Sequence, residues 1–369
     1  MLVYYSKVLF LFYKFAKNYQ LVYYMQFNKK KVLVTGGTGM TGAYLLAKLL
    51  QKNYEVKALK RENSNTNITK NIFNFLFENS DEQFSKINWI NGDITDYNSI
   101  NQAMNSVDYV YHLAAKVSFK PSDKEFILNN NVQGTANIVN AALNYKIKKL
   151  CHVSSIATLG NSFNGDFINE ETERQKKQIV SGYSLSKFRS ENEVWRGIAE
   201  GLNAVIVNPS IILGVGNWEK GSARFIKTVN DGFKYFTNGG TGFIDVNDVV
   251  DVIIKLTESN ISNERFILNS ENLSYKTFFE IIADNLNKKR AHIETSNIML
   301  KSLMIYDKLR YLTTGKEPRV TKFTVSSALQ TKTYSNEKIK ETLNYDFTPI
   351  KDSLKIICER FLFELNSKK

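Results

Sequence analysis

Short apolar runs alternate with longer stretches of helical hydrophobic spacing through the first two thirds of the chain. The short runs predict strands at 31–35, 55–59, 87–90, 109–113, 149–154 and 204–208. The helical patterns between them cover 43–50, 71–78, 96–104, 123–145 and 181–200, and Asp96 is placed to cap its helix. Strands that alternate with helices predict an α/β fold with a doubly wound parallel sheet.

Beyond Pro209 this rhythm changes, and glycines separate shorter helical patterns near 274–286, 336–343 and 350–365. We therefore expect a first domain at 28–208 and a second, smaller region at 209–240 and 259–369. The segment 241–258 is expected to return to the sheet of the first domain. Residues 61–86 begin rich in Asn and Ser and are longer than a tight connection needs, so they predict a surface insertion.

The first 27 residues do not fit this pattern. They are rich in Tyr, Phe and Leu, but Lys7, Lys14 and Lys17 interrupt every apolar run well short of the ~20 residues that a membrane span needs. A secretory signal also fits poorly. Either the segment lies on a membrane surface, or the working chain begins near Met25. We favour the second interpretation, treat 1–27 as an extension outside the fold, and expect no stable membrane insertion.

Composition and charge narrow the class of protein. The chain has 369 residues, enough for two regions that share a surface, and its two cysteines and three scattered histidines favour neither a disulfide framework nor a metal site. The net charge is +13, of which residues 1–30 contribute five lysines, and residues 288–369 contribute 17 Lys and Arg against 9 Asp and Glu. The central part is therefore neutral, which argues against a nucleic-acid partner. The composition and the small number of cysteines favour a soluble, cytoplasmic protein.

The first chemical signal is the glycine-rich run between the first strand and the first helix. It reads Thr35-Gly-Gly-Thr-Gly-Met-Thr-Gly42. The missing side chains at Gly36, Gly39 and Gly42 allow a tight turn and the close approach of a pyrophosphate, and the helix N-terminus offers unpaired N–H groups. Because a strand precedes this run and a helix follows it, we favour a dinucleotide site over a purely structural turn.

The spacing of this run resembles that of the extended short-chain dehydrogenase/reductase superfamily, the NAD(P)-dependent epimerases and dehydratases. Matching motifs follow in order: Gly92-Asp-Ile94, His112-Leu-Ala-Ala115, Asn131-Val-Gln-Gly-Thr135, Ser154-Ser155, Tyr183-Ser-Leu-Ser-Lys187, Asn208-Pro-Ser210 and Gly242-Phe-Ile-Asp-Val-Asn-Asp248. The likeness covers 31–365. It implies a Rossmann-type sheet with a smaller C-terminal substrate-binding region, and a homodimer in which the helices at 123–145 and 181–200 pair across a two-fold axis.

The same resemblance, together with the glycine run, assigns a set of cofactor-binding residues. They are Gly36, Thr38, Gly39, Met40, Gly42, Arg61, Asp93, Ile94, Leu113, Ala114, Ala115, Tyr183, Lys187, Asn208, Pro209 and Ser210. An NAD site usually has an acidic residue at the end of the second strand, but this strand ends in Lys60 and Arg61. Both side chains suit a ribose 2′-phosphate, so NADP is the expected cofactor and NAD the alternative.

Three residues form the expected catalytic group. Tyr183 and Lys187 are four apart on a predicted helix and therefore share one face. An adjacent ammonium lowers the pKa of a phenol, so Tyr183 can exchange a proton with a carbonyl oxygen, while Ser155 donates a hydrogen bond to that oxygen.

Other titratable residues near these motifs receive no chemical role. We read His112 as a structural residue and Cys151 as a buried, inert thiol. Glu170, Glu171 and Glu173 lie in the loop before Tyr183, and we read all three as solvated.

The resemblance also narrows the reaction. Ile156 and Ala157 stand where related dehydratases carry an Asp-Glu pair, and the segment 241–245 lacks the arginine common in sugar-nucleotide epimerases. The pattern resembles the branch that contains dihydroflavonol reductases and hydroxysteroid dehydrogenases. We therefore expect an NAD(P)-dependent oxidoreductase that interconverts a ketone and a secondary alcohol on a small molecule. A sugar-nucleotide epimerase is the alternative, and a non-catalytic dinucleotide-binding sensor or scaffold is the alternative of another class.

Overall fold

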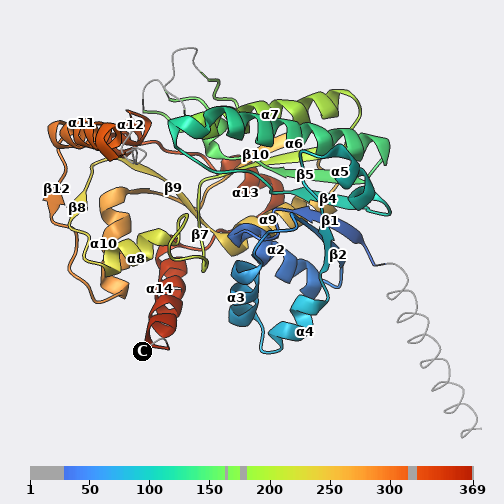
Figure 1. Cartoon of the computed structure of the whole chain (residues 1–369), viewed down its shortest axis with the longest axis horizontal. Coiled ribbons are helices and arrows are strands. Elements are labelled where there is room, and N and C mark those ends of the chain that lie inside the picture. Colours follow the sequence, from blue (N-terminus) through green and yellow to red (C-terminus); the bar gives the residue numbers. More distant parts are fainter. Residues whose placement is uncertain (1–28, 163–164, 175–180, 315–321, 368–369) are drawn as a thin grey trace, which may run out of the picture.

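A parallel sheet of seven strands forms the centre of the molecule (Figure 1). The computed structural model describes residues 29–162, 165–174, 181–314 and 322–367, so the expected extension at 1–27 lies outside the described residues. The strand order is β10-β6-β5-β4-β1-β2-β3, and every neighbouring pair is parallel. This arrangement confirms the predicted Rossmann-type, doubly wound fold.

Six of the seven strands lie where the apolar runs predicted them. They are β1 (Lys31–Thr35), β2 (Glu55–Lys60), β3 (Asn88–Asn91), β4 (Tyr109–His112), β5 (Lys149–Val153) and β6 (Ala204–Pro209). Since β1 pairs with both β2 and β4, the direction of strand order reverses between β1 and β4. At such a reversal the loops after the two strands separate, and α/β proteins bind ligands there.

Helices cover both faces of this sheet. One face packs against α2 (Met40–Gln51), α3 (Asn67–Leu76) and α9 (Val246–Glu258), and the other against α5 (Tyr97–Met104), α6 (Lys124–Asn144) and α7 (Gly182–Ala199). Because side chains alternate along a strand, Val32 and Val34 join the first core and Leu33 the second. The side chain of Asp96 accepts the N–H of Asn98 at the start of α5, which confirms the predicted cap.

The segment 61–86 is more than the surface insertion we predicted. Its helix α3 begins four residues earlier than expected, packs on α2 and buries Thr69, Ile72 and Phe73. A second, short helix, α4 (Ser80–Ser85), follows, and the ring of its Phe84 packs edge-on against Phe73. The aromatic residues of this segment therefore enlarge the core, although its first residues are polar.

The seventh strand, β10 (Glu264–Leu268), was not predicted. It pairs with β6 at the edge of the sheet and comes from the range that we assigned to the smaller region. The segment 241–258 supplies no strand to this sheet; instead its helix α9 packs on β5 and β6. The chain thus returns to the sheet twice, first with a helix and then with a strand.

The smaller region stands beside the C-terminal ends of the strands (Figure 1). Its three-stranded sheet contains β7 (Ile211–Leu213), β9 (Gly240–Asp245) and β11 (Glu271–Ser274), and β8 (Tyr235–Phe236) pairs with β12 (Ile293–Glu294). Its helices are α8 (Arg224–Asn230), α10 (Tyr275–Asn285), α11 (Asn297–Thr314), α12 (Lys322–Leu329) and α14 (Ile350–Asn366), and α13 (Glu337–Leu343) packs back on β10. The predicted helices near 274–286, 336–343 and 350–365 are confirmed as α10, α13 and α14. Within the described ranges, no helix is both long and apolar enough to cross a membrane.

Candidate active site

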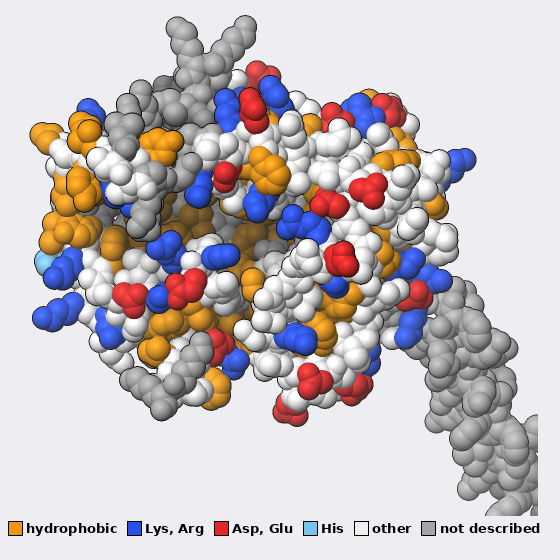
Figure 2. Space-filling view, viewed as in Figure 1, with side chains coloured by type: hydrophobic (Ala, Val, Ile, Leu, Met, Phe, Trp, Pro, Cys, Tyr) orange, Lys and Arg blue, Asp and Glu red, His pale blue; other side chains and the backbone are white. Residues whose placement is uncertain are grey.

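Two cavities open where the strands of the large sheet end. The first, of about 250 Å³, follows β1, β2, β3 and β4, and we call it the glycine-loop cavity. The second, of about 490 Å³, lies between the end of the sheet and the smaller region, and we call it the Tyr183 cavity. Figure 2 shows a hollow between the two parts of the molecule, with hydrophobic side chains on its floor and Lys and Arg side chains around it.

The glycine run forms a wall that tolerates no side chain at two positions. Gly36 has a φ of +82°, and a Cβ there would lie 2.8 Å from the backbone nitrogen of Ala114. A Cβ on Gly42 would lie 2.2 Å from the carbonyl oxygen of Gly36. Gly39 begins α2 without a side-chain cap, so the first N–H groups of the helix are left for a ligand. This cradle fits the pyrophosphate of a dinucleotide.

Nine of the expected cofactor residues line the glycine-loop cavity. They are Gly36, Thr38, Gly39, Arg61, Asp93, Ile94, Leu113, Ala114 and Ala115. Met40, Tyr183, Pro209 and Ser210 line the Tyr183 cavity instead. Gly42, Lys187 and Asn208 line neither cavity, so their expected place in the cofactor site remains a prediction.

Buried hydrogen bonds hold the loop after β4 against the glycine run. The Nδ1 atom of His112 lies 2.7 Å from the hydroxyl of Thr35, and its Nε2 atom lies 3.0 Å from the hydroxyl of Thr135. The Thr35 hydroxyl also accepts the N–H of Ala114. Burial lowers the pKa of His112 to about 3, so the ring is neutral at physiological pH. This placement confirms the structural role that we expected for His112.

Ser155 and Tyr183 both line the Tyr183 cavity. Ser155 follows β5, Tyr183 lies on the first turn of α7, and the Ser155 side chain is close enough to influence the pKa of Tyr183. The ring of Tyr183 packs edge-on against Phe119, with 5.6 Å between the ring centroids. The expected depression of the tyrosine pKa is wrong for the protein alone. Burial raises the pKa of Tyr183, and the Ser155 side chain offsets only part of that rise.

Lys187 lies one turn after Tyr183 and is almost fully buried. Its Nζ atom donates a hydrogen bond to the carbonyl oxygen of Val153, at 2.8 Å. Burial lowers the pKa of Lys187 to about 8, although the nearby carboxylate of Glu191 opposes the shift. The side chain therefore lies under the end of β5, directly behind the Ser155–Tyr183 pair.

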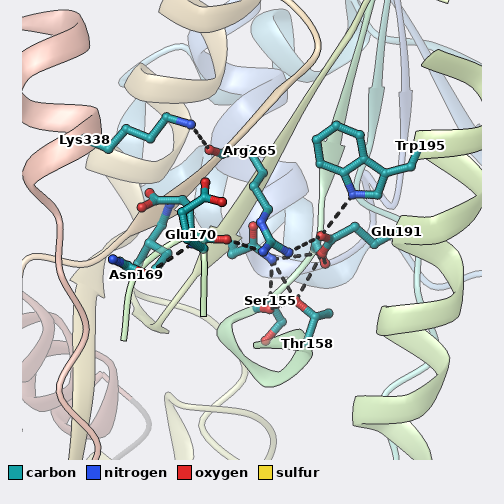
Figure 3. A network of polar contacts seen from close by, with 12 residues as sticks. Ser155, Thr158, Asn169, Glu170, Glu191, Trp195, Arg265 and Lys338 are labelled. Atoms are coloured by element: carbon teal, nitrogen blue, oxygen red, sulfur yellow. Dashed lines mark hydrogen bonds and ion pairs between the residues drawn. The ribbon is translucent and has the colours of Figure 1, made fainter. Parts of the chain in front are cut away.

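Glu191 organises this part of the site, and sequence reasoning missed it (Figure 3). Its Oε2 atom accepts hydrogen bonds from Ser154 at 2.7 Å, Thr158 at 3.1 Å and Asn208 at 3.0 Å. One signal was available: Glu191 follows Lys187 by four residues, so the spacing that paired Tyr183 with Lys187 continues by another turn.

Asn208 belongs to this network and not to the cofactor cavity. Its side-chain amide donates to Ser155 O, Thr158 Oγ1 and Glu191 Oε2. The residue is fully buried. Its expected place in the cofactor site thus remains a prediction, while the structure gives it a role in joining β6 to the turn after β5.

Two further residues complete the network: Arg265 on β10 and Glu170 in the loop before α7 (Figure 3). Arg265 donates to the Oε1 atom of Glu191 at 3.1 Å and to the backbone carbonyl of Glu170. The carboxylate of Glu170 accepts the N–H of Ile267 at 2.7 Å, and only 5% of Glu170 is exposed. Our reading of Glu170 as solvated is therefore wrong, whereas Glu171 and Glu173 are exposed as expected. Cys151 is buried, which confirms its assignment as an inert thiol.

Comparisons with known proteins agree with this geometry. Residues 32–268 match the model of the NAD dependent epimerase/dehydratase family. The chain is 29% identical over 249 residues to the "Putative dihydroflavonol 4-reductase" of Synechocystis sp., covering 65% of the chain and 68% of that relative. It is 25% identical over 333 residues to cinnamoyl-CoA reductase 1 of Petunia hybrida, covering 88% and 89%. The crystal structure of gox2253 superposes with a TM-score of 0.74 at 26% identity, over 90% of this chain and 98% of the other.

Proposed function

The chain belongs to the NAD dependent epimerase/dehydratase family, and from that premise we propose that it reduces a ketone, or oxidises a secondary alcohol, on a small molecule. Membership confirms the expected superfamily and enzyme class, an NAD(P)-dependent oxidoreductase of the extended short-chain dehydrogenase/reductase type. The observation that carries the proposal is that Ser155 and Tyr183 together line a mainly apolar cavity beside the glycine-rich cradle.

A bound nicotinamide cofactor supplies or accepts the hydride equivalent of such a reaction. The residues that would hold its phosphates are Gly36, Thr38 and Gly39, and Asp93 and Ile94 line the part of the cavity that would receive the adenosine. Lys187 would reach the nicotinamide ribose, as the family resemblance implies. We propose NADP over NAD, because Arg61 lines this cavity directly after β2, whereas the acidic residue of its described lining, Asp93, follows β3.

The chemistry of the chain's own residues is proton transfer. Tyr183 is protonated at neutral pH, because burial holds its pKa above the ordinary value, and it can therefore donate a proton to a carbonyl oxygen as negative charge develops there. Ser155 donates a hydrogen bond to the same oxygen and stabilises it. The ammonium of Lys187, close behind, favours the tyrosinate that remains after the transfer.

The proposed substrate class follows from the wall of the Tyr183 cavity. Ile211, Ile212 and Phe323 make it mainly apolar, and Ile156 and Ala157 supply no acid or base for dehydration. Two of the similar proteins are named as a dihydroflavonol reductase and a cinnamoyl-CoA reductase. These names also favour a reductase over a sugar-nucleotide epimerase. The homodimer and the cytoplasmic location stay predictions.

The proposal is tested by single-turnover absorbance measurements. NADPH-loaded protein is mixed with a panel of aryl and alkyl ketones, and the loss of reduced nicotinamide absorbance is followed. We expect oxidation with at least one ketone and the corresponding alcohol as product. Cofactor binding without turnover across the panel, together with release of an inverted sugar nucleotide from a parallel panel, would favour the epimerase alternative.

A further inference from the structure

One lysine stands in the wall of the Tyr183 cavity, and none of the described residues pairs with its charge. Lys332 lines the cavity from the chain segment that follows α12. Its backbone is held against β9, because its N–H donates to the carbonyl of Gly240 at 3.0 Å and Gly240 in turn donates to the carbonyl of Gln330 at 3.1 Å. The position of Lys332 is therefore set by the sheet of the smaller region.

The charge of Lys332 is unbalanced. Among the described residues that line this cavity, Lys332 is the only charged one, and none of them is acidic. The lysines paired elsewhere in the described chain show the contrast: Lys48 lies 2.9 Å from Asp251, and Lys338 lies 2.9 Å from Glu264. Burial alone lowers the pKa of Lys332, with no carboxylate to oppose it. A half-buried cation without a partner is costly, so a bound anion beside Lys332 would stabilise its charge.

The surroundings of Lys332 define what that ligand looks like. Thr241, Gln330 and Tyr334 line the cavity with Lys332, and they lie beside it along the backbone contacts between β9 and the segment after α12, so polar groups gather at this end. Toward Tyr183 the wall becomes apolar through Phe119 and Phe323, whose rings stack at 6.0 Å. A fitting molecule has a polar, negatively charged end, an apolar body and a reactive end at Tyr183.

We propose that the substrate carries one negative charge of the carboxylate class, which pairs with Lys332 while its ketone faces Ser155 and Tyr183. This inference rests on the proposed function and names its substrate class. A single lysine balances a single charge, whereas a diphosphate would leave charge unpaired in a wall that offers no second cation among the described residues.

Binding of two matched dyes tests the charge preference without any turnover. Anilinonaphthalene sulfonate and N-phenylnaphthylamine share an apolar body, and only the first carries a negative charge. We expect NADP-loaded protein to bind the sulfonate at least tenfold more tightly, measured by dye fluorescence. Lys332→Met should abolish this difference and Lys332→Arg should keep most of it. Lys276→Met, which removes an exposed lysine next to Tyr275, should leave it unchanged.

Turnover of matched ketones separates failure of this inference from failure of the proposed function. The panel contains keto acids and their methyl esters. We expect the acids to have a KM at least tenfold below that of the esters, and Lys332→Met to raise the KM of the acids alone. Equal KM values for acids and esters, with equal dye affinities, would overturn the charge assignment and leave the ketone reductase intact. Absence of turnover with either series, while the dye preference persists, would overturn only the reductase.

Discussion

The guanidinium of Arg265 lies 3.1 Å from the carboxylate of Glu191, and this pair joins the edge strand β10 to the helix that carries Tyr183. Glu191 is 3% exposed at its side chain and Arg265 is 24% exposed. Because the same carboxylate also binds Ser154, Thr158 and Asn208, one buried charge ties together β5, β6, α7 and β10.

Removing that charge should destabilise the fold. Glu191→Ala removes the carboxylate that pairs with Arg265 and that accepts from three polar groups, and we expect a loss of about 3 kcal/mol in the free energy of unfolding. Urea unfolding followed by fluorescence measures it. Glu193→Ala is the matched control, since its pair with Arg196 lies at the surface of the same helix and should contribute less than about 1 kcal/mol. Equal losses in the two variants would contradict this account.

The proton donor is tested by Tyr183→Phe. The ring still packs on Phe119 and only the hydroxyl is lost, so cofactor affinity and melting temperature should hold while turnover falls about 100-fold or more. Stopped-flow absorbance reports the turnover. Tyr275→Phe, which also removes a hydroxyl from the cavity wall, should retain the rate of the chemical step. Undiminished turnover in Tyr183→Phe would leave the protein as a dinucleotide binder.

Two glycines of the loop should respond differently to alanine. At Gly39 the nearest atom to an added Cβ is 3.5 Å away, so the protein should fold, but the new methyl group projects into the phosphate cradle. We expect a cofactor Kd raised about tenfold, with a nearly unchanged melting temperature. Gly42→Ala places a Cβ against Gly36 and should cost about 2 kcal/mol or more of unfolding free energy. Titration calorimetry and thermal unfolding distinguish the two outcomes.

Cofactor choice should depend on Arg61. Arg61→Ala removes the fork that suits a 2′-phosphate, so the Kd for NADP should rise about tenfold while the Kd for NAD stays constant. Lys60→Ala should change the ratio of the NADP Kd to the NAD Kd less than Arg61→Ala does. The Lys60 ammonium already donates a hydrogen bond to the side chain of Asn91, at 3.0 Å. An unaltered NADP to NAD ratio in Arg61→Ala would refute the assignment.

Acid should weaken the fold through a buried pair of histidines. The rings of His112 and His152 lie 5.2 Å apart, and burial lowers both pKa values, that of His112 to about 3. The unfolded chain binds protons near pH 6.5 and the folded chain does not. Stability is therefore fully present above pH 6.5 and falls as the pH drops toward 3, by about 1.4 kcal/mol per pH unit for each histidine.

Replacement of His152 isolates one half of this effect. Neither of its ring nitrogens has a hydrogen-bond partner among the described residues, so His152→Leu removes no hydrogen bond within that part of the chain. Between pH 6.5 and 5 its unfolding free energy should fall about half as steeply as that of the parent. His292→Leu, at an exposed position, should keep the parental slope in urea titrations at the same pH values.

Much of the fold was predictable because local signals agreed. β1 begins after a lysine pair and ends at the first glycine, so its bounds match the apolar run. β10 was not predictable, since it opens with Glu264 and Arg265 and leaves only three apolar residues in a polar neighbourhood. What makes it a strand is its pairing with β6, more than fifty residues earlier in the chain.

In the site, too, local sequence patterns were predictable, whereas features that depend on distant parts of the chain were not. The glycine run and the Tyr183–Lys187 spacing are short-range patterns, and the structure places them at one end of the sheet. Glu170 looks like its acidic neighbours in sequence, and its burial depends on the N–H of Ile267, which only the folded sheet brings close. Similarly, the role that we propose for Lys332 rests on the absence of carboxylates among the described residues that line the cavity, which no local sequence pattern reveals.

The late return of the chain to the sheet limits how this protein can be recombined. A chimera that joins residues 28–208 to the remainder of a relative would import β10, α9 and α13 along with the foreign substrate region. The foreign β10 would then have to pair with the native β6, and it would have to supply the partner of Glu191 that Arg265 supplies here. Exchange of specificity is better attempted by grafting the short segments around 211–240 and 322–334. Such grafts keep the native α9 and β10, the two elements with which the chain returns to the large sheet.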